Sequence, residues 1–360
     1  MLVKKIVAYL AVLTGTTALV LATSRTLSEQ IENCRSYALN HDLWWGQQRG
    51  KWGDLTSMSY LDQVNKFCEP KSYDFKDLSN EGEKNIDLYL YGDSYVTEIP
   101  KGAFPCLDSF IFHFRYDTHE YTLNPAKRNI LIIEASERFV RERFRTTGML
   151  SNLKIDGYYD PLHPLEKKKP KATAITPSGF ATLFNPHINQ NLEYHLFNYN
   201  FLIYPRQLKA ALNFELFNRA SGDVAISDDG KYLFYKMTLA QGNICSSYDR
   251  LAEKEVKTIV ASLDTIYDHY KQAGFAEVYF SVIPNPVSIL QPGWYNNLIP
   301  LIQNDPELKV PFIDVYSLFK QHQQPASLYR AGDTHWNNNG AQIWLQLVNE
   351  MLRKESEKQK

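Results

Sequence analysis

The sequence carries almost no net charge and no excess of either sign. Lysine and arginine together number 39, aspartate and glutamate 40, and the formal charge of the 360 residues is −1. This balance gives no reason to expect nucleic acid or an acidic surface as a partner. Internal repeats and low-complexity tracts are also missing, while 44% of the residues are hydrophobic. The composition is therefore that of a globular protein, and neither a repeat array nor a disordered chain.

Cysteine is scarce, with four residues at Cys34, Cys68, Cys106 and Cys245. No C-x-x-C pair and no cluster of histidines at metal-binding spacing occurs, which argues against a structural zinc site. We expect neither a metal nor another cofactor. Four cysteines in an exported chain allow three disulfide pairings, and the sequence does not choose among them.

Only one long hydrophobic run is present, and it lies near the N-terminus. Residues 6–22 are uncharged, Lys4 and Lys5 precede them, and Arg25 follows. This length falls between the core of a signal peptide and a short membrane helix. We expect residues 1–24 to form an uncleaved membrane anchor, with a cleaved signal peptide as the alternative. Both place the rest of the chain in the cell envelope outside the inner membrane, in the periplasm, or secrete it after cleavage.

The remaining chain alternates predicted strands and helices. We expect an N-terminal extension over residues 25–84 and an α/β domain over residues 85–355, with an insertion at about residues 148–245. Buried strands are predicted at residues 86–91, 109–117 and 128–136, and again at 277–285 and 310–315. Helical spacing follows the third of these and recurs at residues 251–273 and 340–354. This order predicts a central parallel sheet covered on both faces.

A serine directly follows the first predicted strand, in the sequence Gly92-Asp93-Ser94. Ligands of such sheets bind beyond the carboxyl ends of the strands, so Ser94 would project into the binding crevice. Its own N–H and that of Tyr95 could face a developing oxyanion. The ordinary alternative is a turn serine or a helix-capping serine.

An Asp-x-His pair near the C-terminus supplies the groups that such a serine needs. A serine hydroxyl is a weak nucleophile until a base such as His335 takes its proton. Asp333, two residues earlier, can bind the second ring nitrogen, and Trp336 could cover the pair. A surface turn is the alternative for this pair taken alone.

The same tripeptide occurs once more, from Asp117 to His119. It follows a different predicted strand, and the Trp-Asn sequence that follows the later pair is missing. We expect a strand-end turn here, although this strand end should face the same crevice.

Five segments of the chain resemble the SGNH (GDSL-like) hydrolase superfamily, over about residues 86–355. In chain order they are "YGDSYV", "NILIIEASERF", "VYFSVIPNPVSIL", "PFIDVYSLF" and "LYRAGDTHWNNNG". Within the superfamily, the chain is most similar to the branch with alginate O-acetyltransferases and DHHW-type exported proteins. The resemblance implies a three-layer, flavodoxin-like α/β fold with Ser94, His335 and Asp333 as a catalytic triad.

Two signature positions depart from the general pattern of that superfamily. The glycine that helps to form the oxyanion hole is missing, and Glu134 stands at the end of the strand that usually supplies an asparagine. We expect the N–H groups of Ser94 and Tyr95 to serve as oxyanion donors. Arg138 is a further candidate, with a structural ion pair to a neighbouring glutamate as the favoured alternative. We interpret Asn285 as a turn residue.

Three functions are compatible with these residues. The first is an acyltransferase that forms an acyl-enzyme on Ser94 and passes the acetyl group to a polysaccharide, and the resemblance implies a membrane-bound O-acyltransferase as donor. The second is a carbohydrate acetylesterase, in which water replaces the sugar hydroxyl. The third is a non-catalytic envelope protein that binds glycan.

Overall fold

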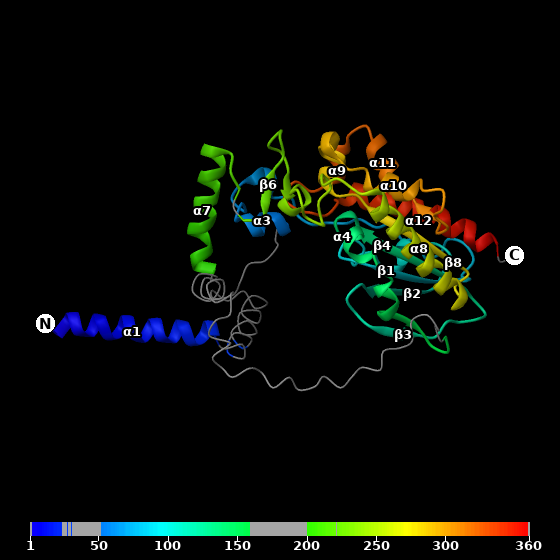
Figure 1. Ribbon diagram of the computed structural model, residues 1–360, viewed down its shortest axis with the longest axis horizontal. Helices are drawn as coiled ribbons and strands as arrows, with labels where there is room; N and C mark the ends of the chain where they lie inside the picture. Colours follow the sequence, from blue (N-terminus) through cyan, green and yellow to red (C-terminus); the bar gives the residue numbers. More distant parts are fainter. Residues whose placement is uncertain are drawn as a thin grey trace. The chain divides into compact units, whose positions relative to one another are not determined.

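The computed structural model describes residues 2–23, 52–158, 200–220 and 222–358, together with Leu27 and Gln30. The chain forms two compact units (Figure 1). One comprises Met1–Lys51, Ser59–Val64 and Lys167–Ser221. The other comprises Trp52–Met58, Asn65–Glu166 and Gly222–Lys360, and it contains the sheet and every residue of the candidate site.

The first unit contains two long helices, α1 (Leu2–Thr23) and α7 (Asn200–Phe217). The segment Val3–Val20 of α1 is long and apolar enough to cross a membrane, a property that signal sequences share. The predicted apolar helix is therefore confirmed, and its insertion into a membrane stays a prediction.

The second unit is built on a parallel sheet of five strands, as the alternation of elements predicted. The strands are β1 (Ile86–Gly92), β2 (Leu107–Phe114), β4 (Arg128–Ser136), β8 (Glu277–Ile283) and β9 (Phe312–Ile313). Their order across the sheet is β2-β1-β4-β8-β9, and every neighbouring pair is parallel. The chain therefore moves outward from β1 to β2 and then returns to the other side of β1 with β4.

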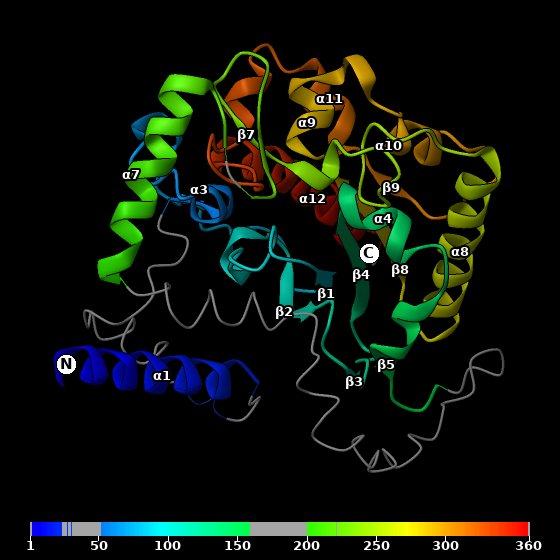
Figure 2. The same cartoon turned by 60° about the vertical axis from the view of Figure 1, so that its left-hand side comes forward.

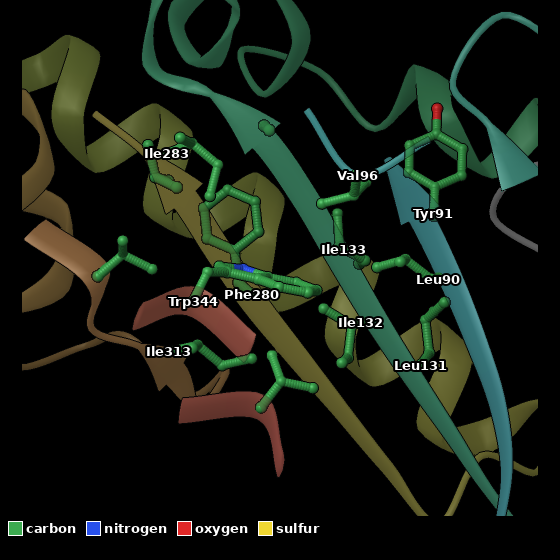
Figure 3. Close-up of a cluster of buried hydrophobic side chains, with 14 of the residues drawn as sticks. Leu90, Tyr91, Val96, Leu131, Ile132, Ile133, Phe280, Ile283, Ile313 and Trp344 are labelled. Carbon is green, nitrogen blue, oxygen red and sulfur yellow. The ribbon is translucent and has the colours of Figure 1, made fainter. Parts of the chain in front are cut away.

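The apolar composition of the strands follows from burial on both faces. In β4, residues 130–133 read Ile-Leu-Ile-Ile, and each side chain is at most 1% exposed. A strand with one solvated face would alternate apolar and polar residues, whereas a central parallel strand does not. Figure 3 shows such side chains on neighbouring strands, among them Leu90, Ile132 and Phe280.

Helices cover the two faces of the sheet (Figures 1 and 2). Successive residues of a strand point to opposite faces. Phe280 of β8 meets Phe144, which follows α4 (Glu137–Arg143), at 4.9 Å between ring centroids. The next residue, Ser281, accepts a hydrogen bond of 3.0 Å from Trp344 of α12 (Asn338–Glu357). On the α4 side lies α8 (Glu253–Gln272), held to α4 by an ion pair between Arg141 and Glu255.

The remaining helices and strands of the described residues are short. They are α3 (Asp54–Ser59), η1 (Asn65–Phe67), η2 (Lys101–Ala103), β3 (His119–Tyr121), η3 (Gly148–Ser151), β5 (Leu153–Ile155), β6 (Val224–Ile226), β7 (Leu233–Tyr235), η4 (Lys236–Thr238), α9 (Pro286–Leu290), η5 (Pro292–Trp294), α10 (Leu298–Gln303), α11 (Val315–Gln321) and η6 (Pro325–Leu328). The strands β6 and β7 form an antiparallel hairpin. Within the predicted insertion, residues 159–199 lie outside the described residues.

The compact unit with the sheet begins before the boundary that we placed at residue 84. It includes Trp52–Met58 and all residues from Asn65 onward to Glu166. Among the cysteines, Cys106 and Cys245 are free thiols in the described part of the chain. Cys34 lies outside the described residues.

Candidate active site

The candidate site lies at the carboxyl edge of the parallel sheet, where β1 and β4 diverge. The chain leaves β1 toward β2 on one side and enters β4 on the other. Ligands of open α/β sheets bind at such a reversal of strand order. Ser94 follows β1 by two residues, and Ser136 ends β4. The two strand ends therefore bring polar side chains to one edge of the sheet.

Ser94, His335 and Asp333 form a continuous hydrogen-bonded chain. The distance from Ser94 Oγ to His335 Nε2 is 2.8 Å, and that from His335 Nδ1 to Asp333 Oδ1 is 2.6 Å. Ser94 is exposed, His335 is half-buried and Asp333 is buried. The hydroxyl thus faces solvent, while the carboxylate that orients the ring is shielded from it. Although 241 residues separate Ser94 from His335, folding brings all three predicted residues together.

Arg330 fixes the buried Asp333 carboxylate from the other side. Its guanidinium donates to Asp333 Oδ2, and it also donates to the backbone carbonyls of Trp52 and Glu69. Burial raises the pKa of Asp333, but the hydrogen bond from His335 and the charges of His335 and Arg330 outweigh it and hold this pKa well below its usual range. Asp333 is therefore ionised near neutral pH.

A second carboxylate, from Asp54 at the start of α3, supports the loop of the Asp-His pair. It accepts the Thr334 N–H at 2.8 Å and the Thr334 hydroxyl, and its Oδ2 lies 3.9 Å from His335 Nδ1. Burial and the neighbouring Asp333 charge raise the pKa of Asp54. The pKa of Asp54 is thus higher than that of Asp333, and Asp54 takes up a proton first as the pH falls. Sequence reasoning missed Asp54, because nothing in "KWGDLT" distinguishes it from a helix-capping aspartate.

The loop of the Asp-His pair is tightly packed against Gly53, Thr56 and Phe67. A Cβ added to Gly332 would lie 2.3 Å from the Phe67 carbonyl oxygen and 2.4 Å from Thr56 Cγ2. Position 332 therefore admits only glycine without displacement of the loop. At its other end, the Asn337 side chain caps α12 by accepting the N–H groups of Asn339 and Gly340.

The Asp93 carboxylate organises the turn that presents Ser94. It accepts the Tyr95 N–H at 3.1 Å, the Arg115 guanidinium at 3.2 Å and the Ser136 hydroxyl at 2.8 Å. Asp93 is 2% exposed, so these charge-assisted bonds replace the water that it would otherwise bind. Through them, residues after β1, β2 and β4 are joined beside the nucleophile.

Glu134 supports the same turn from inside β4. Its Oε2 accepts the Asp93 N–H at 2.8 Å, and a Cβ added to Gly92 would lie only 2.7 Å from that oxygen. Burial and the Asp93 charge raise the pKa of Glu134 well above its ordinary value. Its protonated form is therefore favoured relative to that of an exposed glutamate. Gly92 is required because the turn approaches the Glu134 side chain so closely.

The two predicted oxyanion donors differ in their surroundings. Within the described part of the chain, the Ser94 N–H makes no hydrogen bond. The Tyr95 N–H already donates to Asp93. The Tyr95 ring lies 4.7 Å from the His335 ring, and its hydroxyl donates to the Thr334 carbonyl. Tyr95 therefore holds the histidine loop in place.

Arg138 is half-buried and has no ion-pair partner among the described residues. Its guanidinium carbon lies 5.1 Å from the Phe139 ring and 6.0 Å from the Tyr235 ring. The ion pair that we favoured for Arg138 is not formed there. Glu134 contacts the Asp93 N–H instead, and Glu137 accepts the Asn285 N–H at 2.8 Å. The cation is left available for a bound anionic or polar group.

Trp336 does not line the crevice. Its side chain is completely buried, and its ring lies edge-on to Tyr95 at 5.2 Å between centroids. It packs behind Tyr95 and close to Trp344, at 6.1 Å. Trp336 thus supports the site from the core and does not cover it.

The second Asp-Thr-His sequence forms the turn between β2 and β3. Asp117 is exposed, its N–H donates to the Phe114 carbonyl, and its own carbonyl lies 3.2 Å from His113 Nε2. His119 is exposed as well. Neither side chain contacts Ser94 or His335 among the described residues.

The carboxylate and imidazole atoms of Asp54, Asp333 and His335 lie within 4.8 Å of one another. This donor set could in principle hold a cation. However, both Asp333 oxygens are already bound, one by His335 and the other by Arg330. A guanidinium beside the carboxylate opposes a second positive charge, so the arrangement suits a hydrogen-bonded triad better than a metal centre.

Comparisons with known proteins found no relative of this chain. No family model, no curated protein and no solved structure matches the chain. The function is therefore inferred from the geometry of the site and from the resemblance of the five sequence segments.

Proposed function

We propose that the protein is an exported serine acyltransferase or esterase that acts on O-acetyl groups of a cell-envelope or extracellular polysaccharide. The observation that supports this most strongly is the continuous chain of short hydrogen bonds from Ser94 through His335 to Asp333. An exposed hydroxyl, an imidazole within hydrogen-bond reach and a buried carboxylate on its second nitrogen are what nucleophilic acyl transfer needs.

The proposed reaction has two steps with the same proton shuttle. Ser94 Oγ attacks the carbonyl carbon of an acetyl ester or thioester while His335 Nε2 takes the hydroxyl proton. When the tetrahedral intermediate collapses, the bond to the leaving oxygen or sulfur breaks and His335 gives that atom the proton. An acceptor hydroxyl then attacks the acyl-enzyme, His335 takes its proton, and Ser94 recovers the proton as the new ester leaves.

The negative charge that develops on the reacting carbonyl oxygen needs hydrogen-bond donors that have no other acceptor. The Ser94 N–H meets this condition within the described chain, whereas the Tyr95 N–H is occupied by Asp93. We assign the first oxyanion donor to Ser94 N–H, and Arg138 is a candidate for the second, since its guanidinium has no carboxylate partner there.

The order of the sheet supports the resemblance to the SGNH superfamily. Numbered along the chain, the five strands follow the order 2-1-3-4-5, which is that of flavodoxin-like folds. A sheet that is covered by helices on both faces also has the three-layer architecture that the resemblance implies. The catalytic role of the triad and membership of the superfamily remain parts of the proposal.

The helix α1 fits an enzyme held at the membrane. It would keep the catalytic unit near a membrane-bound O-acyltransferase, which is the acyl donor implied by the resemblance. A cleaved signal peptide would release the same unit into the envelope or the medium.

The first test is the formation of an acyl-enzyme. The full chain is incubated with a nitrophenyl acetate ester, quenched and analysed by intact mass and peptide mapping. We expect acetyl on Ser94 in the wild-type protein and none in Ser94→Ala. A wild-type protein that releases no nitrophenol and carries no acetyl would favour a non-catalytic glycan-binding protein instead.

The second test separates transfer from hydrolysis. Polysaccharide from a deletion strain is compared with wild-type polysaccharide by mass spectrometry. We expect acetylation to be lost, because the proposed second step adds acetyl to the glycan. A gain of acetylation would identify the acetylesterase.

A further inference from the structure

We propose that an open cleft beside the Asp-His loop binds a neutral or amine-bearing glycan chain, with a pyranose ring stacked on Trp294. The cleft lies between the turn of the β6–β7 hairpin, the η5 segment and the start of η6, and its volume is about 530 Å³. Binding itself is independent of the triad. Its role as the acceptor site rests on the proposed function.

Trp294 is the main reason for this assignment. It belongs to the short turn Pro292–Trp294, and its side chain is 80% exposed. Tryptophan is highly buried in most proteins because its ring removes a large apolar area from water. The face of an aromatic ring carries negative potential, which suits the C–H groups on one side of a pyranose ring. An exposed tryptophan at the rim of a polar cleft is therefore typical of a sugar-stacking platform.

Polar groups of fixed geometry surround this platform. The Tyr248 hydroxyl donates to the Gln291 carbonyl at 2.7 Å, and the Gln291 side-chain oxygen accepts the Asp228 N–H at 3.4 Å. The Gln291 amide nitrogen and the Asp228 carboxylate make no hydrogen bond among the described residues. They are available as a donor and an acceptor for sugar hydroxyl groups. Such placed polar groups beside an aromatic surface give a ligand site its specificity.

The charge of the cleft selects the class of glycan. Asp228 and Asp229 line it, and Lys and Arg are absent from its lining residues. The hydrogen bond from Ser227 lowers the pKa of Asp229, so this carboxyl is ionised near neutral pH. Lys231 Nζ lies 3.5 Å from Asp229 Oδ2 and offsets part of that charge. The Asp228 carboxylate has no ion-pair partner among the described residues, so it disfavours uronate or phosphate groups and accepts hydroxyl groups and protonated amines. Neutral and amino sugars therefore fit, and anionic glycans do not.

The cleft is coupled to the catalytic loop through the hairpin. The Tyr232 hydroxyl donates to the Ala326 carbonyl at 2.5 Å, at the cleft wall. The next residue, Leu233, donates its N–H to the Ala331 carbonyl at 2.8 Å, two residues before Asp333. The hairpin thus contacts both the cleft wall at Ala326 and the loop that leads to Asp333 and His335.

The experiment measures binding of the full chain in detergent to an oligosaccharide array that includes neutral, amine-bearing and uronic-acid glycans. We expect retention on neutral or amine-bearing glycans, at least a tenfold loss of affinity in Trp294→Ala, and partial recovery in Trp294→Phe. The matched control is Ser94→Ala, which should bind as the wild-type protein does. Acyl-enzyme formation from nitrophenyl acetate is measured on the wild-type protein in parallel.

Three outcomes would overturn the assignment. They are no retention on any glycan, retention unchanged by Trp294→Ala, and a preference for uronic-acid glycans. Because acyl-enzyme formation is measured separately, a failed glycan site and a failed triad give different results.

Discussion

Two carboxylates approach His335, and their replacement by asparagine tests which of them belongs to the catalytic triad. Asp333 Oδ1 lies 2.6 Å from the ring nitrogen and Asp54 Oδ2 lies 3.9 Å from it. Asp333→Asn and Asp54→Asn are a matched pair, because each removes one charge and leaves the side chain nearly unchanged in size.

The structure predicts very different losses. When His335 carries the proton taken from Ser94, a charge pair at 2.6 Å is worth about 6 kcal/mol and one at 3.9 Å about 4 kcal/mol, at an effective dielectric constant of about 20. Asp333 has 5% of its side chain exposed, so solvent screens its interaction with His335 only weakly. Asp54 has 38% exposed, and solvent reduces its contribution to about 1 kcal/mol. We expect a loss of about 10³- to 10⁴-fold for Asp333→Asn, which also favours the wrong ring tautomer, and about fivefold for Asp54→Asn.

The assay is the rate of nitrophenol release in the acylation phase, measured by stopped flow at saturating protein. Thermal unfolding of each variant is recorded alongside, because Asp333 and Asp54 both accept hydrogen bonds from the backbone. A folded variant that has lost acylation reports on the site and not on stability.

Equal losses in the two variants would refute the reasoning, and so would a larger loss in Asp54→Asn. Either result would mean that burial does not decide which carboxylate orients the ring.

Three further predictions concern individual side chains. Ser94→Ala and His335→Ala should each remove nearly all acylation, by orders of magnitude, with the fold retained in circular dichroism. Asp117→Asn should change the acylation rate less than twofold, because the exposed carboxyl contacts neither catalytic group; a loss comparable with that of Asp333→Asn would show that we chose the wrong Asp-His pair. Burial raises the pKa of Glu137 from 4.5 to about 7. Since the folded protein holds this proton between those values and the unfolded chain does not, the free energy of unfolding should fall by about 3 kcal/mol as the pH rises through that interval. Chemical denaturation at pH 5 and pH 8 should show this fall reduced in Glu137→Gln; an unchanged pH dependence would contradict the assignment.

The sheet was predictable because its strands carry a strong local signal. In a parallel sheet with both faces covered, runs such as Ile130–Ile133 must be apolar throughout, and no other element of that length has this composition between turns. The extent of the compact unit was less predictable. The segment Trp52–Met58 joins it through contacts with Arg330 and Thr334, and pairing between distant segments leaves no mark in either one.

In the candidate site, too, some residues were predictable from the sequence and others were not. Ser94, Asp333 and His335 were identified because their chemistry requires these residue types next to a strand end and in a short Asp-x-His spacing. The groups that hold them, Asp54 and Arg330, are ordinary charged residues in sequence. Their roles depend on burial and on partners more than 250 residues away, which only the folded chain reveals.

The three-way junction at Asp93 has a consequence for how the protein would lose activity. One of its contacts comes from Arg115, directly after β2, and β2 is an outermost strand of the sheet. Outer strands open more readily than inner ones, because they have neighbours on one side only. Fraying there would release the serine turn while the interior remained intact, so inactivation would come before denaturation.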